Sequence, residues 1–180
     1  MSFRVRRSSL ILPVNVPRFI EKAHTRGADA IVLDLEDSVP PAEKASAREL
    51  VREAIPLVAR GGAEVAVRVN NDPALISDDI EASVWPGLSS LSIPKVESAA
   101  ELERLVAQIE RLERARGIPA GQVKLSVAIE TPRGLLACET IATASPRIVT
   151  MGIGPEDYCL SLGVEPSPTG SSSSTGSREW

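Results

Sequence analysis

The chain has 180 residues, a net charge of −4 and a sequence pI near 5.2, with 43% hydrophobic and 24% charged residues. This composition predicts one globular domain, and the mildly acidic balance and 3% aromatic content argue against a nucleic-acid partner. No apolar run reaches the ~20 residues that span a membrane, and no signal peptide is evident. Cys138 and Cys159 lack metal-ligand spacing. We expect a cytoplasmic enzyme of the α/β class without a membrane partner.

Short apolar runs rich in β-branched residues alternate with amphipathic stretches along most of the chain. The predicted strands cover residues 9–13, 30–35, 64–69, 88–94, 124–130 and 148–154. The predicted helices follow them at about 17–26, 41–59, 74–83, 99–116, 134–144 and 156–162. The helical pattern is strongest in 99–116, where Leu102, Leu105 and Ile109 share one face. Six strand–helix units are therefore expected.

Uniform alternation of strands and helices predicts a parallel sheet with right-handed crossovers. A doubly wound sheet and a (β/α)8 TIM barrel both satisfy this pattern. The first strand is not followed by a G-x-G-x-x-G motif, and the sequence has no Walker A lysine, so the nucleotide-binding motifs of doubly wound folds are missing. Polar residues recur at the carboxyl ends of several strands, where barrel enzymes place their catalytic groups. We therefore expect a TIM-barrel-family fold with about six βα units present and the last two missing.

The length of the chain is short for this fold. A barrel of eight units takes ~250 residues, so residues 1–165 are expected to form an incomplete barrel domain. Residues 166–180 (PSPTGSSSSTGSREW) are of low complexity and predict a flexible tail. Two explanations of this change in composition stay open: a truncated or frameshifted product, and a natural or engineered linker.

Charged side chains gather where the predicted strands end. These are Asp34, Glu36 and Asp37 after the second strand, Arg68 in the third, Glu130 in the fifth and Asp157 after the sixth. If the strands surround one axis, Arg68, Glu130 and Asp157 converge on one mouth of the barrel. Two carboxylates with room for water suit Mg²⁺, and an arginine opposite them suits a carboxylate or a developing oxyanion. The single histidine, His24, argues against a histidine-based metal site or a Ser-His-Asp triad.

An ordered set of motifs covers about residues 5–165. It consists of 7–13 (RSSLILP), 27–39 (GADAIVLDLEDSV) with Lys44 and Arg48, 67–70 (VRVN), 93–98 (IPKVES), 128–134 (AIETPRG) and 152–157 (GIGPED). Each motif alone is weak, but the ordered set is specific. It resembles the citrate lyase beta-subunit-like family of the HpcH/HpaI aldolase group, which has malyl-CoA and citramalyl-CoA lyases as relatives.

This resemblance implies a Mg²⁺-dependent carbon–carbon lyase that assembles as a homo-oligomer, a trimer or a hexamer. Such enzymes cleave a β-hydroxyacyl thioester, for example citryl-CoA, malyl-CoA or citramalyl-CoA, into an acyl thioester and a small keto acid, or run the condensation. The partners that it implies are therefore an acyl-CoA or acyl-carrier thioester and a keto acid.

The resemblance also implies roles for individual residues. Glu130 and Asp157 match the two metal-binding carboxylates, and Arg68 matches the arginine that binds substrate and steadies the thioester enolate. Catalytic roles near the metal are implied for Glu36 and Asp37. Substrate contacts to the thioester or its phosphates are implied for Arg7 and Lys95.

Structural explanations compete with these roles, because a carboxylate at a strand-to-helix turn often caps the next helix, as Glu36 and Asp37 would. Arg7 and Lys95 equally fit solvated or paired surface cations. Two alternative functions stay open, a pyruvate-type aldolase on free hydroxy-keto acids and a non-catalytic or defective truncated family member.

Overall fold

The computed structural model describes residues 5–165, so the tail predicted at 166–180 lies outside the described residues. The strands are β1 (Ser9–Pro13), β2 (Ala30–Asp34), β3 (Glu64–Arg68), β4 (Ser90–Ile93), β5 (Lys124–Ile129) and β6 (Ile148–Ile153). The helices are α1 (Pro17–Ala23), α2 (Lys44–Val58), α3 (Ile76–Ser83), α4 (Ala99–Ala115), α5 (Pro132–Leu136), α6 (Cys138–Thr143) and α7 (Pro155–Leu162), with 3₁₀ turns η1 (Pro41–Glu43) and η2 (Ala59–Gly61). All six predicted strand–helix units are present in order.

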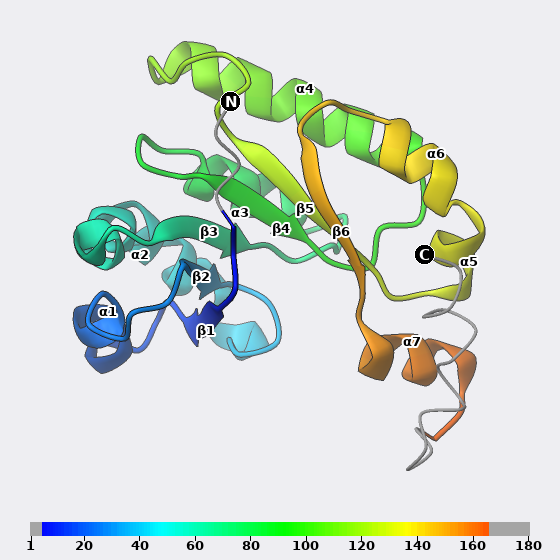
Figure 1. Cartoon of the computed structure of the whole chain (residues 1–180), viewed down its shortest axis with the longest axis horizontal. Coiled ribbons are helices and arrows are strands. Elements are labelled where there is room, and N and C mark those ends of the chain that lie inside the picture. Colours follow the sequence, from blue (N-terminus) through cyan, green and yellow to red (C-terminus); the bar gives the residue numbers. More distant parts are fainter. Residues whose placement is uncertain (1–4, 166–180) are drawn as a thin grey trace.

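The six strands form one parallel sheet in the order β1-β2-β3-β4-β5-β6. A doubly wound sheet reverses its strand order at a switch point, whereas each strand of a TIM barrel pairs with the next one along the chain. The sequential order confirms the barrel-type arrangement. Helices α1 to α4 contact one another in turn around the outside of the curved sheet (Figure 1). Among the described residues, β1 and β6 are the edges of this open arc.

Several helix boundaries differ from the prediction for local reasons. Helix α1 ends at Ala23, three residues early, and a turn leads to Gly27, which has a positive φ of 70°. The predicted helix 41–59 begins with the 3₁₀ turn η1 before the α-helical hydrogen bonding of α2. The predicted helix 134–144 is two short helices, α5 and α6, which meet at Ala137. The strand bounds differ less: β2, β3, β5 and β6 end one residue before the predicted end, and β4 covers Ser90–Ile93 in place of 88–94.

Helix α4 illustrates how the sequence directs the outer layer. The Ser98 hydroxyl accepts a hydrogen bond from the Glu101 backbone N–H at 3.3 Å and so caps the first turn. Leu102, Ile109 and Leu112 on one face are buried against the sheet, while the opposite face is charged. Within residues 5–165, no helix has the length and apolar character needed to cross a membrane.

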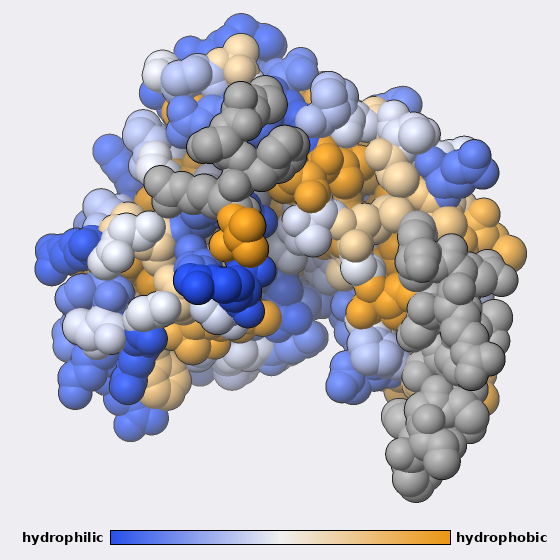
Figure 2. All heavy atoms as spheres, viewed as in Figure 1, coloured by the Kyte–Doolittle hydropathy of each residue, from blue (hydrophilic) through white to orange (hydrophobic). Residues whose placement is uncertain are grey.

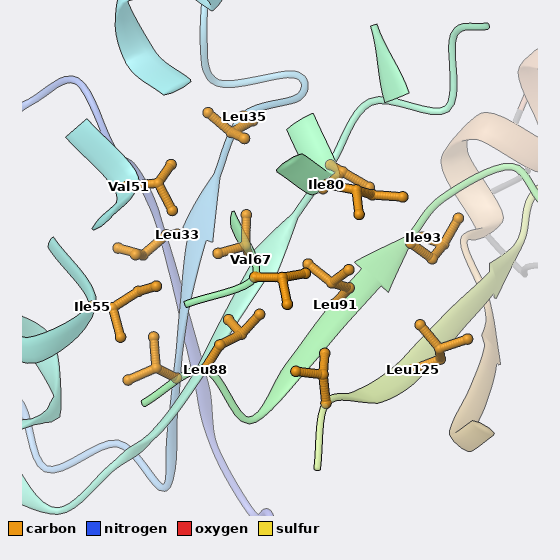
Figure 3. Close-up of a cluster of buried hydrophobic side chains, with 14 of the residues drawn as sticks. Leu33, Leu35, Val51, Ile55, Val67, Ile80, Leu88, Leu91, Ile93 and Leu125 are labelled. Atoms are coloured by element: carbon orange, nitrogen blue, oxygen red, sulfur yellow. The ribbon is translucent and has the colours of Figure 1, made fainter. Parts of the chain in front are cut away.

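The hydrophobic core lies between the outer face of the sheet and the helices (Figure 3). Leu33 and Leu35 from β2 and its end, Val67 from β3 and Leu91 from β4 point into it, as the two-residue period of a strand requires. The alternate positions face the other way, toward the concave side of the arc.

The concave face carries small and polar side chains in its middle part. They are Ala66, Ser90, Ser92, Ser126 and Ala128, which alternate with core residues. The space-filling view shows the molecule hollowed between the N-terminal units and the arm formed by α7 (Figure 2). The same alternation puts Arg68 and Glu130, at the carboxyl ends of their strands, on this concave face.

Candidate functional site

Asp34 and Arg68 form the base of the site. They are direct register partners at the carboxyl ends of β2 and β3. Arg68 Nε donates to Asp34 Oδ1 at 2.7 Å and Arg68 Nη2 donates to Oδ2 at 2.8 Å, a bidentate pair with a fully buried carboxylate. Burial raises the pKa of Asp34, but hydrogen bonds from Arg68 and Ser38 outweigh burial and lower it. The pair holds the guanidinium in one orientation.

Glu36 and Asp37 extend this cluster from the end of β2. Glu36 is 6% exposed, and its Oε2 lies 3.1 Å from Arg68 Nη1 but accepts no hydrogen bond from the described residues. Burial is the main reason that the pKa of Glu36 is raised. The Asp37 side chain is 60% exposed and lies 3.4 Å from Arg68 Nη1. Glu36 is therefore an inner group of the site, whereas Asp37 lies at its rim.

Lys95, after β4, connects three carboxylates. Its Nζ lies 2.8 Å from Glu36 Oε1 and 3.1 Å from Asp157 Oδ2. Its backbone N–H donates to Glu130 Oε2 at 3.0 Å. Burial lowers the pKa of Lys95, but the hydrogen bonds and charges of Glu36 and Asp157 outweigh burial and raise it. The ammonium group is therefore charged throughout the neutral range.

Glu130, at the end of β5, lies against the backbone of the turn after β6. A Cβ on Gly154 would come within 2.2 Å of Glu130 Oε1 and 2.7 Å of its Cγ, so only glycine leaves room for this carboxylate. Burial raises the pKa of Glu130, the Lys95 backbone hydrogen bond opposes this, and the Asp157 charge raises it further. The two carboxylates therefore interact electrostatically across the β5–β6 edge.

The donor set fits a magnesium ion held by two carboxylates. Mg²⁺ prefers hard oxygen ligands and commonly keeps waters or substrate oxygens at its other positions. Glu130 and Asp157 supply such oxygens. The Glu130 carboxylate fits against Gly154 because glycine has no Cβ. Within residues 5–165, no group of three or more His, Cys, Asp or Glu side chains is placed to hold a metal ion. A metal here would therefore depend on water or substrate for most of its coordination.

A second layer of hydrogen bonds fixes the loops that carry these groups. Lys44 Nζ donates to the carbonyls of Leu35 and Glu36 at 3.0 and 2.9 Å. The buried carboxylate of Asp79 accepts hydrogen bonds from the Asn70 backbone N–H and side chain, at 2.8 and 2.7 Å, and from Arg48 Nε at 2.5 Å. These bonds tie the loops after β2 and β3 to helices α2 and α3.

Two clefts open beside the cluster, with Lys95 and Asn71 in the walls of both. One, of about 420 Å³, is lined by Glu36, Asp37 and residues of the loops after β2 and β3. The other, of about 640 Å³, lies between the loops after β3, β4 and β5 and the start of α4. Space for a small polar substrate is therefore present next to the charged groups.

The structure brings together six of the seven residues singled out from the sequence. They are Glu36, Asp37, Arg68, Lys95, Glu130 and Asp157. Arg7 is not among them. It precedes β1 at the amino ends of the strands and binds Asp29, with Nη2–Oδ1 at 2.8 Å. Arg7 therefore lies at the opposite end of the sheet from the other six residues.

Sequence reasoning missed two acidic residues that shape the site. Asp34 appeared only as one of three clustered acids, and its pairing with Arg68 requires the β2–β3 register. Asp79, in α3, is fully buried and supports Asn70. An acidic residue that alternates with core residues in a buried strand, as Asp34 does, is the signal that could have identified it.

Comparison with known proteins adds an independent finding. A family model described as HpcH/HpaI aldolase/citrate lyase matches residues 7–175. The citrate lyase subunit beta of Leuconostoc mesenteroides subsp. cremoris is 38% identical over 168 residues, which cover 93% of this chain and 56% of that protein. An L-malyl-CoA/beta-methylmalyl-CoA lyase of Cereibacter sphaeroides is 36% identical over 177 residues, which cover 92% and 55%. The chain thus spans about half the length of these relatives.

A solved structure agrees with this finding. It is the citrate lyase beta subunit of M. tuberculosis complexed with oxaloacetate and magnesium, with a TM-score of 0.67 and 30% sequence identity. The match covers 90% of this chain and 65% of that one. The similarity therefore includes the fold as well as the sequence.

Proposed function

Because this chain belongs to the HpcH/HpaI aldolase/citrate lyase family, we propose that it acts as a Mg²⁺-dependent carbon–carbon lyase. The proposed reaction cleaves a β-hydroxyacyl thioester, of the citryl-CoA, malyl-CoA or citramalyl-CoA type, into an acyl thioester and a keto acid, or forms it from them. The similar proteins named as citrate lyase subunit beta and as malyl-CoA lyase support this class of reaction.

One observation carries the proposal. Arg68, Glu36, Lys95, Glu130 and Asp157 meet at the carboxyl ends of the strands, on the concave face and next to open clefts. These side chains come from or follow five different strands, so their meeting depends on the fold and not on local sequence. A set of groups assembled in this way at this end of a barrel is typical of an active site.

In the proposed reaction, Glu130 and Asp157 would hold Mg²⁺, which as a Lewis acid would polarise the keto-acid oxygen and orient its carboxylate. During cleavage a general base takes the proton of the substrate hydroxyl, and the C–O group becomes the carbonyl of the keto acid. The electron pair of the broken carbon–carbon bond passes to the thioester, which leaves as an enolate and then takes up a proton at carbon to give the acyl thioester. These bond changes place negative charge on the thioester oxygen.

Arg68 is suited to that negative charge. Of its five N–H donors, three are engaged, by Asp34 at Nε and Nη2 and by Asp37 at Nη1. Within residues 5–165, Nη1 faces the carboxylates of Glu36 and Asp37, and the second N–H of Nη2 is the donor proposed for the enolate oxygen. Because Asp34 fixes the guanidinium before substrate binds, little reorganisation is needed during the reaction, and this favours electrostatic stabilisation.

The proposed partners are a CoA or acyl-carrier thioester, a small keto acid and further copies of this chain. Assembly as a homo-oligomer, a trimer or a hexamer, is supported by exposed apolar side chains near the C-terminal units, Leu136 at 91% and Leu160 at 76% exposure. The two thiols are both free, which suits a cytoplasmic location. Light scattering of the purified chain would measure the assembly.

The direct test is release of keto acid from thioesters. The 180-residue chain would be incubated with Mg²⁺ and malyl-, citramalyl- or citryl-CoA, and the keto acid trapped as its phenylhydrazone and measured by absorbance. We expect Glu130→Gln and Arg68→Lys to lower the rate by about 100-fold or more. Glu49→Gln, an equal charge change on the exposed outer side of α2, is the matched control.

The outcomes of this test separate the functions. Release from a thioester that depends on Glu130 supports the proposal. Release from free hydroxy-keto acids but not from thioesters would assign the chain to pyruvate-type aldolases. No release from either, by a folded chain, would contradict the proposed activity and leave a non-catalytic family member.

A further inference from the structure

Lys95 occupies an unusual position in the backbone as well as in the site. Among residues 5–165 it is the one residue other than glycine with a positive φ, 52°. Such a conformation is disfavoured for a side chain with a Cβ and persists where surrounding contacts enforce it. Here the contacts are the backbone hydrogen bond to Glu130 and a hydrogen bond from Asn71 Nδ2 to the Lys95 carbonyl at 3.0 Å.

The backbone and the side chain of Lys95 contact different carboxylates. The peptide N–H holds Glu130, whereas the ammonium group lies 2.8 Å from Glu36 and 3.1 Å from Asp157. A neutral side chain at position 95 would keep the first contact and lose the other two. The positive charge can therefore be removed without removing the backbone support of Glu130.

The Lys95 ammonium group and a divalent cation would both bind the carboxylate of Asp157. Asp157 is paired with Lys95 and is also a proposed metal ligand, and its side chain is 31% exposed, so an ion in solution can reach it. A metal ion at Glu130 and Asp157 would lie close to the positive charge of Lys95, and the two positive charges would repel each other.

We propose that the Lys95 ammonium is the internal counter-ion of the metal-free site, which holds Asp157 until a divalent cation replaces it there. The inference rests on the proposed metal site at Glu130 and Asp157. In the metal-free chain Lys95 offsets the repulsion among Glu36, Glu130 and Asp157. When a divalent cation binds, Lys95 stays paired with Glu36 and loses its pairing with Asp157. The positive charge of Lys95 therefore lowers the affinity of the site for the metal.

The test is the affinity for Mg²⁺, measured by titration calorimetry on the metal-stripped chain. We expect Lys95→Met to bind Mg²⁺ on the order of tenfold more tightly than the parent, because a repelling charge is gone. Lys95→Arg, which keeps the charge, should stay within about threefold of the parent. Lys124→Met is the matched control, since Lys124 begins β5 at the opposite end of the sheet and its loss changes the net charge equally.

A second measurement uses the unmodified chain and does not depend on the folding of a variant. The chain has four lysines, so the ¹H–¹⁵N signals of their ammonium groups can be assigned by single substitutions. We expect the Lys95 signal to shift when Mg²⁺ is added while the Lys22 and Lys124 signals stay in place.

The outcomes distinguish this inference from the proposed function. Equal or weaker Mg²⁺ binding by Lys95→Met, or a Lys95 signal that does not respond to saturating Mg²⁺, would overturn the counter-ion role alone, provided that Glu130→Gln abolishes binding. Mg²⁺ binding that is unchanged in Glu130→Gln would instead overturn the metal site, and the inference with it.

Discussion

Asp34 and Arg68 face each other across β2 and β3, and the guanidinium holds both oxygens of the carboxylate with N–O distances of 2.7 and 2.8 Å. Asp34 also accepts hydrogen bonds from the backbone N–H groups of Glu36 and Ser38, at 3.0 and 3.1 Å. One buried carboxylate thus orients the arginine and shapes the turn that carries Glu36. The geometry of the site depends on a residue that has no contact with solvent.

Asp34→Asn should therefore weaken both stability and activity. The side chain keeps its shape but loses the charge that binds Arg68, and we expect the free energy of unfolding to fall by about 2 kcal/mol. Urea denaturation measures this change. Asp37→Asn is the matched control, because Asp37 has one 3.4 Å contact and a side chain that is 60% exposed, and it should cost less than about 0.5 kcal/mol. Equal losses in the two variants would contradict the role given to Asp34.

Gly154→Ala should displace Glu130. The added Cβ would meet Glu130 Oε1 at 2.2 Å, so either the carboxylate or the turn after β6 must move. We expect Mg²⁺ affinity to fall about tenfold or more and stability to fall by about 1–3 kcal/mol. Gly152→Ala, two residues earlier, meets nothing within 4 Å and should leave both quantities unchanged. Titration calorimetry and thermal melts of the two variants make the comparison.

The Mg²⁺ affinity should depend on pH through Glu130. Burial raises the pKa of Glu130 above its ordinary value of 4.5, and a protonated carboxyl group does not bind a cation. The affinity should therefore fall as the pH is lowered, beginning at a pH above 4.5. In the metal-free chain the sign is reversed, because the folded state holds this proton more tightly than the unfolded state, so Glu130 reduces stability as the pH rises. An affinity that stays constant down to pH 4.5 would disprove the assignment.

The buried pair of Glu113 and Arg147 makes stability depend on pH in the opposite direction to Glu130. Glu113 in α4 binds Arg147 at 2.7 Å, and both are almost completely buried. Burial raises the pKa of Glu113, but hydrogen bonds from Arg147 and from the backbone N–H groups of Val123 and Gly121 outweigh burial and lower it. Its contribution to stability is therefore present above 4.5 and is lost as the pH falls through the lowered pKa.

Glu113→Gln should thus cost about 3 kcal/mol at neutral pH, and its difference from the parent should shrink below pH 4.5. Denaturation at several pH values measures this difference. Glu110→Gln is the control, since Glu110 lies 3.7 Å from Arg147 with a side chain that is 48% exposed, and it should cost less than about 0.5 kcal/mol. A difference for Glu113→Gln that grows toward acid pH would contradict the lowered pKa.

Much of the fold could be predicted because strand periodicity and helix amphipathicity are local properties. The alternation of core and concave residues, seen at Leu33, Val67 and Leu125, can be read directly from the chain. The break between α5 and α6 at Ala137 could not be predicted, because the apolar pattern of the sequence continues through it. Helix boundaries depend on such local competition among hydrogen bonds.

Some residues of the candidate site could likewise be predicted from the sequence, whereas the contacts among them could not. Glu130 and Arg68 could be singled out because polar residues at strand ends are visible in the sequence. The contacts of Lys95 could not be predicted, because they require the relative positions of β4, β5 and α7. The distance of Arg7 from the cluster could not be predicted either, because a motif gives a residue's neighbours in the chain but not the end of the sheet at which it lies.

The most direct test of the central claim is a thermal melt of the 180-residue chain with Mg²⁺ and oxaloacetate, each at about 100 times its Kd. A ligand set that binds only the folded state should raise the midpoint by about 5 °C or more, and Glu130→Gln should abolish the shift. A cooperative melt whose midpoint does not respond to Mg²⁺ and oxaloacetate, or responds equally in Glu130→Gln, would contradict the claim that this cluster is a metal-dependent lyase site.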